Sequence, residues 1–445
     1  MSEEKQAANQ LPIRSVKYLT FLSFGIFGTQ MAFGLESSQL GRLFQTIGAK
    51  PELLGIIFII PSLTGLIAQP LIGKYSDRTW LPSLGGRRMP YLIIGSILTV
   101  LSLIILPNSG SFGWPAAMAV SVAAAIVGIF MVASNVCVQP YKMLVGDMVH
   151  SRQKGQAYAI QSLLLNAGIL IAAVAPFIMT SMGISNTAKP GVVPDTVAYA
   201  FYLAAIAISL CSLVTIKNVK EYSPEEFNQY HGNGEQQAAP KNMKKLLTEA
   251  PRIFWIMALV QFFAYFAFSY LWVYGAGVMA DNIYGTTNPN SVGYQQGGNL
   301  FGLMSALYAL ITVLITIFLS RLAKKYYVKT LAITLMIGGF GFISIFLAHT
   351  LFTMTLSFIL VGIGWSALTV YPLTFVTDAI PNRYMGTYLG LFNAQLCIPQ
   401  IAGSLLSVVL LPLLHGSMPR MIFLSGILLI LAAFSTLIIK KEDIQ

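Results

Sequence analysis

The stretch of sequence that decides the fold lies between two long apolar segments and reads Gly73-Lys-Tyr-Ser-Asp77-Arg78-Thr-Trp-Leu-Pro-Ser-Leu-Gly-Gly86-Arg87-Arg88-Met-Pro90. It places an acid and three guanidinium groups in a short turn where two membrane helices would meet water. A carboxylate at a helix end can form charge-assisted, bidentate bonds to a basic loop and so clamp neighbouring helices. The alternative is a solvated basic loop that only marks the inner side of a membrane.

The composition around this loop indicates a membrane protein. The chain is 56% hydrophobic and 10% charged, against about 45–50% and 25% in soluble domains. Apolar runs of about 20 residues, the length that crosses a bilayer core, recur along the whole sequence. We expect twelve transmembrane helices in an all-α membrane protein, near residues 18–41, 53–73, 90–106, 115–141, 156–182, 197–216, 252–280, 298–320, 329–348, 351–377, 386–413 and 420–439.

The Lys and Arg residues indicate how the chain is oriented. If the N-terminus is inside, only four of the 27 fall in outer segments, namely Arg42, Lys50, Lys189 and Arg420. Because inner segments carry the excess of positive charge, we expect both termini in the cytoplasm of a multi-pass protein of the inner (plasma) membrane. This bias accounts for the net charge of +11 without a nucleic-acid partner. Residues 1–17 lack the apolar core of a secretory signal peptide.

The residues that bind metals or form disulfides are sparse. Cys137, Cys211 and Cys397 all fall inside apolar runs and are expected as small core residues. The four histidines are scattered without ligand spacing. We therefore expect no metal site, no cofactor and no enzymatic activity.

A polar stretch divides the chain into two groups of six helices. We expect a cytoplasmic tail (1–17), an N-terminal bundle (18–216), a cytoplasmic linker (217–251), a C-terminal bundle (252–440) and a short tail (441–445). The segment Asp147-Met-Val-His-Ser-Arg152-Gln-Lys-Gly155 is echoed by Asp378-Ala-Ile-Pro-Asn-Arg383-Tyr-Met-Gly386 with the same intervals. Two copies at the inner ends of the fourth and tenth helices predict pseudo-symmetric bundles with a site between them.

The charged residues of the inner loops are expected to form an inner-gate clamp. Its members are Asp77, Arg78, Arg87, Arg88, Asp147, Arg152, Asp378 and Arg383. The counterpart of the paired-arginine loop in the second half, Arg321-Leu-Ala-Lys324-Lys325, has no aspartate. We therefore expect an asymmetric clamp.

Several motifs resemble one family. They are Gly73-x3-Asp77-Arg78 with Gly86-Arg87-Arg88-Met-Pro90, Gln139-Pro140-Tyr-Lys142-x4-Asp147, Ile398-Pro399-Gln400 and Phe44-Gln45-Thr46-Ile47-Gly48-Ala49. The first resembles the loop between the second and third helices of the major facilitator superfamily. Together they resemble the plant sucrose transporters and their bacterial maltose and sucrose permease relatives. The resemblance implies the major facilitator fold and a proton-coupled α-glucoside symporter that works by alternating access.

The proton-linked acid departs from that family. Relatives commonly carry an aspartate in the fourth helix, four residues before an asparagine; here Asn135 is present but Met131 stands in the acid's place. Glu36 is the only carboxylate well inside a predicted span, and charged groups inside a membrane usually face a cavity. It is our candidate for proton coupling, because closure of a cavity around it would favour its protonated form. The alternatives are a permanent ion pair with Lys142 or a solvated acid in the outer vestibule.

Amides and aromatic residues supply the candidates for sugar contact. Amides offer donors and acceptors in a fixed plane, and aromatic faces pack against the C–H side of a pyranose. The candidates are Gln30, Asn135, Gln139, Gln261, Tyr265, Trp272, Trp365, Asn393 and Gln400. Buried amides could instead join helices, and aromatic residues could serve packing or the membrane interface.

The expected function is import of a disaccharide, maltose or sucrose, with a proton, by a monomer in a lipid bilayer. The alternative is a major-facilitator exporter of drugs or other amphiphilic solutes. The amide-rich helix faces favour the sugar. A sensor without transport activity would need an added signalling segment.

Overall fold

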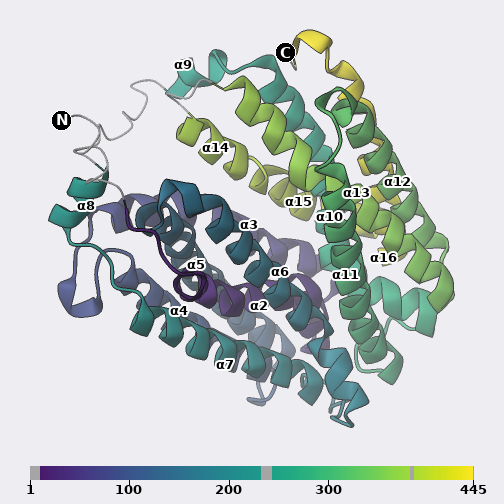
Figure 1. Cartoon of the computed structure of the whole chain (residues 1–445). Helices are drawn as coiled ribbons and strands as arrows, with labels where there is room; N and C mark the ends of the chain where they lie inside the picture. The colour runs from purple at the N-terminus through teal and green to yellow at the C-terminus, as the bar shows by residue number, and fades with distance from the viewer. Residues whose placement is uncertain (1–10, 232–242, 381–384, 444–445) are drawn as a thin grey trace, which may run out of the picture.

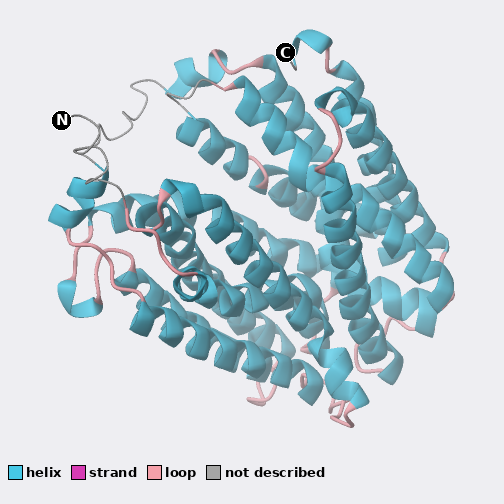
Figure 2. Ribbon diagram, viewed as in Figure 1, coloured by secondary structure: helices cyan, strands magenta, loops and turns pink. Residues whose placement is uncertain are grey.

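The computed structural model describes residues 11–231, 243–380 and 385–443, and most of them lie in helices (Figures 1 and 2). Within these ranges, 12 stretches are long and apolar enough to cross a membrane. The predicted all-α class with twelve transmembrane helices is therefore confirmed.

The transmembrane helices fall into two groups of six along the chain. The first group is α2 (Val16–Thr46), α3 (Pro51–Arg78), α4 (Met89–Ile105), α5 (Ala116–Met148), α6 (Lys154–Ser181) and α7 (Asp195–Asn218). The second is α10 (Arg252–Tyr284), α11 (Val292–Leu319), α12 (Tyr327–Leu347), α13 (Leu351–Ala379), α14 (Met385–Ala394) with α15 (Cys397–Leu413), and α16 (Met418–Ser435). Two short helices, α8 (Pro224–His231) and α9 (Met243–Thr248), lie in the linker. Several helices run past the predicted apolar spans, since those spans mark only the part that crosses hydrocarbon.

The eleventh span is broken, although the sequence predicts it as one run over 386–413. Between α14 and α15 the Leu396 N–H bonds to the Asn393 carbonyl and the Ile398 N–H to the Gln395 carbonyl. Pro399 explains the break, because it has no N–H to donate to Gln395 and its ring crowds that carbonyl. The predicted span is present as one apolar stretch, Gly390–Leu413, and the break lies within it.

The two groups repeat the same helix contacts. In the first, α2 packs against α5, α6 and α7, and α4 packs against α5 and α7. In the second, α10 packs against α13, α15 and α16, and α12 packs against α13 and α16. Between the groups, α3 contacts α15 and α11 contacts α6. These two contacts are equivalent, because each joins the second helix of one group to the fifth helix of the other. Figure 1 shows the two groups side by side, as expected for pseudo-symmetric bundles.

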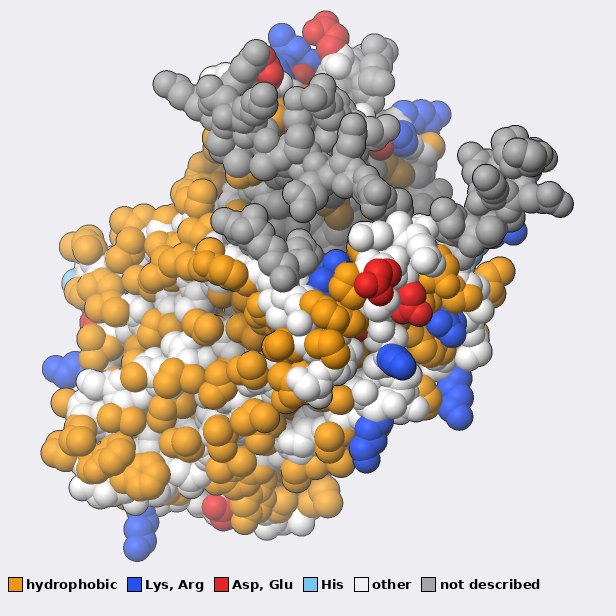
Figure 3. All heavy atoms as spheres, turned by 90° about the vertical axis from the view of Figure 1, so that its left-hand side faces the viewer, with side chains coloured by type: hydrophobic (Ala, Val, Ile, Leu, Met, Phe, Trp, Pro, Cys, Tyr) orange, Lys and Arg blue, Asp and Glu red, His pale blue; other side chains and the backbone are white. Residues whose placement is uncertain are grey.

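The outer surface is apolar, as a lipid-facing surface must be. Hydrophobic side chains cover most of the face drawn in Figure 3, and the charged side chains visible there lie mostly toward its margins. Large residues such as Leu163, Leu405 and Val409 are exposed on helices that would face hydrocarbon.

Both terminal segments lie at one end of the bundle. Near the N-terminus, the Arg14 N–H donates to Gln153 Oε1 between α5 and α6 at 2.8 Å. Near the C-terminus, Asp443 pairs with Arg252 at the start of α10 at 2.8 Å. We call this the tail end. The opposite end, which carries the connections 47–50, 182–194 and 285–291, is the far end.

Candidate functional site

A small cavity lies between the two halves, walled by α2, α3, α10 and α15. Its lining residues are Glu36, Phe58, Pro61, Ser62, Ser269, Trp272, Val273, Gln400 and Ser404. About 20 Å³ is open to the centre of a water molecule, which is room for about one or two waters and far too little for a sugar ring. Three predicted site residues, Glu36, Trp272 and Gln400, meet in this narrow, partly open cavity.

Glu36 reaches the cavity from the middle of α2. It is half-buried, and within the described residues its carboxylate has no hydrogen-bond or ion-pair partner. The alternative of a permanent ion pair with Lys142 therefore does not hold in this conformation. A carboxylate left without a partner in a membrane-embedded cavity is costly when charged and much less costly when protonated. The position can therefore exchange a proton as water enters and leaves.

Gln400 joins the two halves across this cavity. Its Oε1 accepts a hydrogen bond from Ser62 Oγ on α3 at 2.9 Å. One turn toward the tail end, the Cys397 thiol lies next to Gly65 of α3. The polar face of α15 is thus turned toward the other half, as the sequence predicts for Gln400.

The aromatic candidates form one cluster in the second half. The Trp365 ring lies 5.3 Å from Tyr265 and 5.9 Å from Trp272, centroid to centroid. Phe268 packs between them, 4.4 Å from Trp365, and Trp272 Nε1 donates to the Tyr308 hydroxyl at 3.4 Å. Of this cluster only Trp272 lines the cavity, where its ring offers an apolar face that suits a pyranose.

Two amide candidates are already bonded to other amides. Asn135 Oδ1 accepts from Gln69 Nε2 at 3.0 Å, which links α5 to α3. Gln261 Oε1 accepts from Gln395 Nε2 at 3.1 Å, at the break between α14 and α15. In this conformation Asn135 and Gln261 therefore join helices, which was the alternative to sugar contact, since a buried amide without water takes a protein partner. Gln69 and Gln395 are absent from the sequence-based candidates, although both are polar residues inside predicted spans.

Three further candidates do not line this cavity. Gln30 is buried at the contact with α6, next to Gly168. Gln139 is half-buried and Asn393 is exposed near the end of α14. Glu36 and Gln30, two candidates on the same helix α2, are therefore separated, with Glu36 at the cavity and Gln30 in a helix contact.

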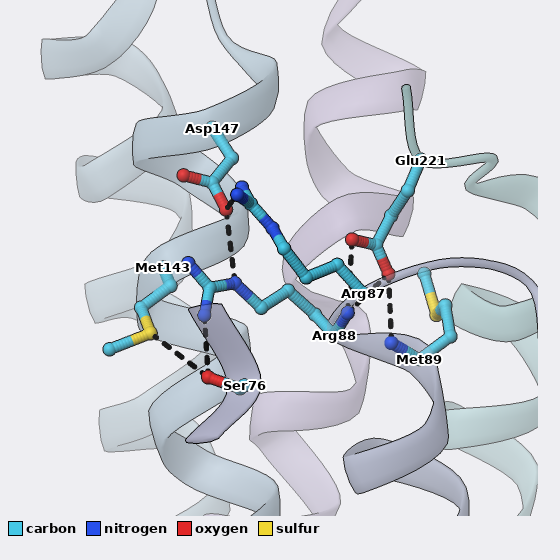
Figure 4. A network of polar contacts seen from close by, with 7 residues as sticks. All are labelled: Ser76, Arg87, Arg88, Met89, Met143, Asp147 and Glu221. Carbon is cyan, nitrogen blue, oxygen red and sulfur yellow. Dashed lines mark hydrogen bonds and ion pairs between the residues drawn. The ribbon is translucent and has the colours of Figure 1, made fainter. Parts of the chain in front are cut away.

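A cluster of charges closes the tail end of the first half (Figure 4). Asp147 Oδ2, at the end of α5, lies 3.0 Å from Arg87 Nη2 and 3.1 Å from Arg88 Nε. The Arg88 side chain is only 4% exposed, and its Nη1 also donates to Ser76 Oγ on α3. The guanidinium groups thus tie three helices together, as the sequence predicts for Arg87, Arg88 and Asp147.

The sequence reasoning missed one member of this cluster, Glu221. Its carboxylate accepts the backbone N–H of Arg88 at 2.7 Å and of Met89 at 2.8 Å, so it caps the start of α4. Gly86 has a φ of 142°, and a Cβ there would lie 2.7 Å from that of Glu221. Burial is the largest influence on the pKa of Glu221 and raises it, while the N–H groups of Met89 and Arg88 act in the opposite direction. An acid directly after the last predicted span of the first half is the signal that could have revealed it.

The second half carries its own version of the clamp. Lys324 Nζ lies 2.6 Å from Asp378 Oδ2, at the end of α13. The expected asymmetry concerns the loop, which has no aspartate of its own. Lys324 of this loop pairs instead with Asp378, the acid of the repeat and one of the expected clamp residues. Arg152 is exposed and makes no ion pair within the described ranges, since the turn Ser151–Gln153 carries it to the surface. The side chains of Asp77 and Arg78, and the whole of Arg383, lie outside the described residues.

Comparison with known families decides the class of the protein. The family model of the Major Facilitator Superfamily matches residues 20–404 and 271–443. The chain belongs to the major facilitator superfamily.

This major facilitator protein is also similar to individual proteins of known name. It is 26% identical over 288 residues to the general alpha-glucoside permease of Schizosaccharomyces pombe, an alignment that covers 60% of this chain and 49% of that permease. It is 22% identical over 417 residues to the sucrose transport protein SUC4 of Arabidopsis thaliana, covering 84% of this chain and 80% of that protein. Among solved structures, a bacterial homologue of the human lysosomal transporter Spinster, inward-facing and occupied, superposes with a TM-score of 0.67 at 13% identity over 98% of this chain and 99% of that one.

As a major facilitator protein with 12 apolar helices in its described residues, the chain is a multi-pass membrane protein. Within the described ranges, no group of three or more His, Cys, Asp or Glu side chains could hold a metal ion. What the cavity offers is a proton-accepting carboxylate, an amide, three serines and an aromatic wall. Groups of these kinds can bind and orient a polar solute, and a carboxyl group can hold or release a proton.

Proposed function

We propose that this chain imports an α-glucoside disaccharide, maltose or sucrose, together with a proton by alternating access. The observation that carries the proposal is the meeting of Glu36, Gln400 and Trp272 in one cavity between the halves. The names of the sucrose and alpha-glucoside transporters among its relatives support the solute class. The two bundles, 18–216 and 252–440, are the bodies that move.

The chemistry of the cavity fits a sugar better than an amphiphile. A disaccharide has many hydroxyl groups, which the Gln400 amide and the Glu36 carboxylate can bond, and an apolar ring face, which Trp272 can cover. An amphiphilic drug would leave the amide and the carboxylate unpaired and dry, which costs free energy. The alternative of a drug exporter is therefore disfavoured.

The proton provides the driving force. In this narrow cavity Glu36 is without a partner, and we infer that it crosses the occluded state as a neutral acid. With both termini in the cytoplasm of the plasma membrane, each proton that moves inward across 100 mV contributes about 2.3 kcal/mol. That corresponds to somewhat under two decades of sugar accumulation.

Uptake of a radiolabelled sugar panel, in a strain without permeases of its own, tests the proposal. We expect saturable uptake of maltose or sucrose that other α-glucosides compete for and that a protonophore collapses. A chain that moves amphiphilic dyes outward, with no competition by either sugar, would refute it. Sugar uptake that continues in the presence of the protonophore would support the sugar as the solute and refute the coupling to protons.

A further inference from the structure

A buried arginine at the far end holds the two halves together. Arg42 lies near the end of α2 and is 1% exposed. Its guanidinium donates to four amide oxygens, in Gln39 at 3.2 Å and in Asn186, Gln295 and Asn299 at 2.7 Å each. Gln295 and Asn299 belong to α11 of the second half, whereas Gln39 and Asn186 belong to the first. The guanidinium therefore bridges the halves.

The acceptors of Arg42 are themselves held by neighbours in both halves. Asn299 Nδ2 donates to Thr180 Oγ1 on α6 at 2.7 Å. Gln295 Nε2 donates to Thr46 Oγ1 on α2 at 3.0 Å. These bonds fix the orientation of the amides, so that their oxygens point at the guanidinium. The arrangement is a single interlocked network across the far end.

All four acceptors are neutral, which sets Arg42 apart from the other buried arginine, Arg88. Within the described ranges, no carboxylate pairs with Arg42, whereas Asp147 pairs with Arg88. A buried charge without a counter-charge is an expensive way to join helices, because the guanidinium gives up its hydration for neutral acceptors. It suits a contact that must also open, because the guanidinium regains water as the halves part.

Glycines bring the helices into backbone contact around this arginine. A Cβ at Gly298 would overlap the Cδ of Arg42, and one at Gly302 would overlap the Ala173 carbonyl of α6. On the other side of α2, a Cβ at Gly41 would lie 2.7 Å from the Val273 carbonyl oxygen. Val273 also lines the cavity that holds Glu36. The seam formed by Gly41, Gly298 and Gly302 therefore holds α2 against α10 next to the cavity, and α11 against α2 and α6.

We propose that Arg42 is the latch of the far-end gate, which holds α11 against α2 while the cavity is closed to that side and releases it when the halves rock. The two ion-paired clamps at the tail end differ in kind, since each joins residues of its own half. A guanidinium held by neutral amides is strong enough to close the gate and weak enough to let it reopen. The inference holds for any solute, so it stands apart from the proposed sugar specificity.

The test measures how fast a cysteine in the cavity reacts with a membrane-impermeant thiosulfonate reagent. The reporter is Ser404→Cys in a chain that also carries Cys397→Ser, because the other native cysteines, Cys137 and Cys211, are buried. Sealed vesicles of both orientations are labelled, and the side of the terminal segments is identified by protease cleavage of a C-terminal tag. Labelling from the side opposite the tag reports opening of the far end.

Two substitutions should move the labelling rate in opposite directions. Arg42→Met keeps the packing of the side-chain stem and removes every hydrogen bond, so far-side labelling should accelerate by about tenfold or more, the worth of one hydrogen bond to a charged group. Asn299→Asp gives the guanidinium a counter-charge at the same position, so far-side labelling should slow by about the same factor. Arg420→Gln is the matched control and should change nothing, because Arg420 is an exposed far-end arginine whose hydrogen bond, to the Leu414 carbonyl, stays within the second half.

A labelling rate that Arg42→Met leaves unchanged, or that Asn299→Asp increases, would overturn the proposal. If Arg42→Met does not yield folded protein, the labelling rate of Asn299→Asp alone tests the proposal, because this variant leaves the guanidinium of Arg42 and all its N–H donors in place. None of these readings needs a sugar, so they remain valid if another solute is carried.

Discussion

Lys324 Nζ lies 2.6 Å from Asp378 Oδ2 at the tail end of the second half, in the place that Arg88 and Asp147 occupy in the first. Both pairs join the loop before the third helix of a half to the end of its fourth helix. They differ in exposure, since the side chains of Arg88 and Asp147 are 4% and 18% exposed, whereas those of Lys324 and Asp378 are 66% and 48% exposed. The same pairing is thus buried in one half and solvated in the other.

This difference predicts unequal costs for the same substitution. Asp147→Asn removes the counter-charge of a buried guanidinium and should lower the free energy of unfolding by about 3 kcal/mol. Asp378→Asn, the matched control, removes a pair that water already screens, so the Tm should stay unchanged. Thermal unfolding of the two purified variants in the same detergent measures both. Equal shifts in Tm would show that burial does not set the strength of these pairs.

The cap made by Glu221 predicts a pH dependence. Burial raises the pKa of this carboxyl in the folded chain, so the folded state holds the proton more tightly than the unfolded state does. The resulting stabilisation is complete below the unfolded value of about 4.3 and is lost as the pH rises through the raised folded pKa. The Tm of the native chain, compared with that of Glu221→Gln at the same pH, should therefore rise as the pH is lowered from above the folded pKa toward the unfolded value. A constant difference between the two melting temperatures would contradict this.

Glu36→Gln should separate transport from accumulation. The amide imitates the protonated acid, so the cavity can still close, but no proton is exchanged. Uphill uptake in energised vesicles should be lost, while exchange of labelled for unlabelled sugar should continue. Glu52→Gln is the control, because Glu52 lies at the start of α3 and does not line the cavity. If Glu36→Gln still accumulates sugar as the native chain does, Glu36 has no role in proton coupling.

Gln400 and Ser62 form one hydrogen bond, and their substitution distinguishes sugar contact from helix joining. If Gln400 bonds the sugar, Gln400→Ala should raise the half-saturation constant about tenfold or more, and Ser62→Ala should leave it nearly unchanged. If the bond only joins the halves, both variants should behave alike. Initial rates of uptake over a range of sugar concentrations decide between them.

The transmembrane helices could be predicted from the sequence because their length and hydropathy are sufficient to locate them. The break in the eleventh span could not be predicted, because a proline inside a membrane helix is an ambiguous signal. Pro140 and Pro372 lie within continuous helices, whereas Pro399 coincides with a break. Neighbouring helices decide whether the freed carbonyl finds another partner, and the local sequence does not contain them.

The candidate site was predictable only in part, for a related reason. Glu36, Gln400 and Trp272 face one cavity, as their positions on three helices predict. Asn135 and Gln261 instead bond to Gln69 and Gln395. Which polar group meets another depends on the register between helices, and helix periodicity gives only the face of each helix. The latch at Arg42 was missed because its partners are neutral amides far away in the sequence.

The seam at Gly41 and Gly302 has a cost that concerns the whole cell. At these positions the wall between the compartments is backbone against backbone, with hydrogen as the only side chain that fits. A methyl group would wedge the helices apart and open a leak for water and ions even in the absence of cargo. Such a variant would drain the stored energy of the membrane continuously, so its cost would appear in growth yield whatever solute is present.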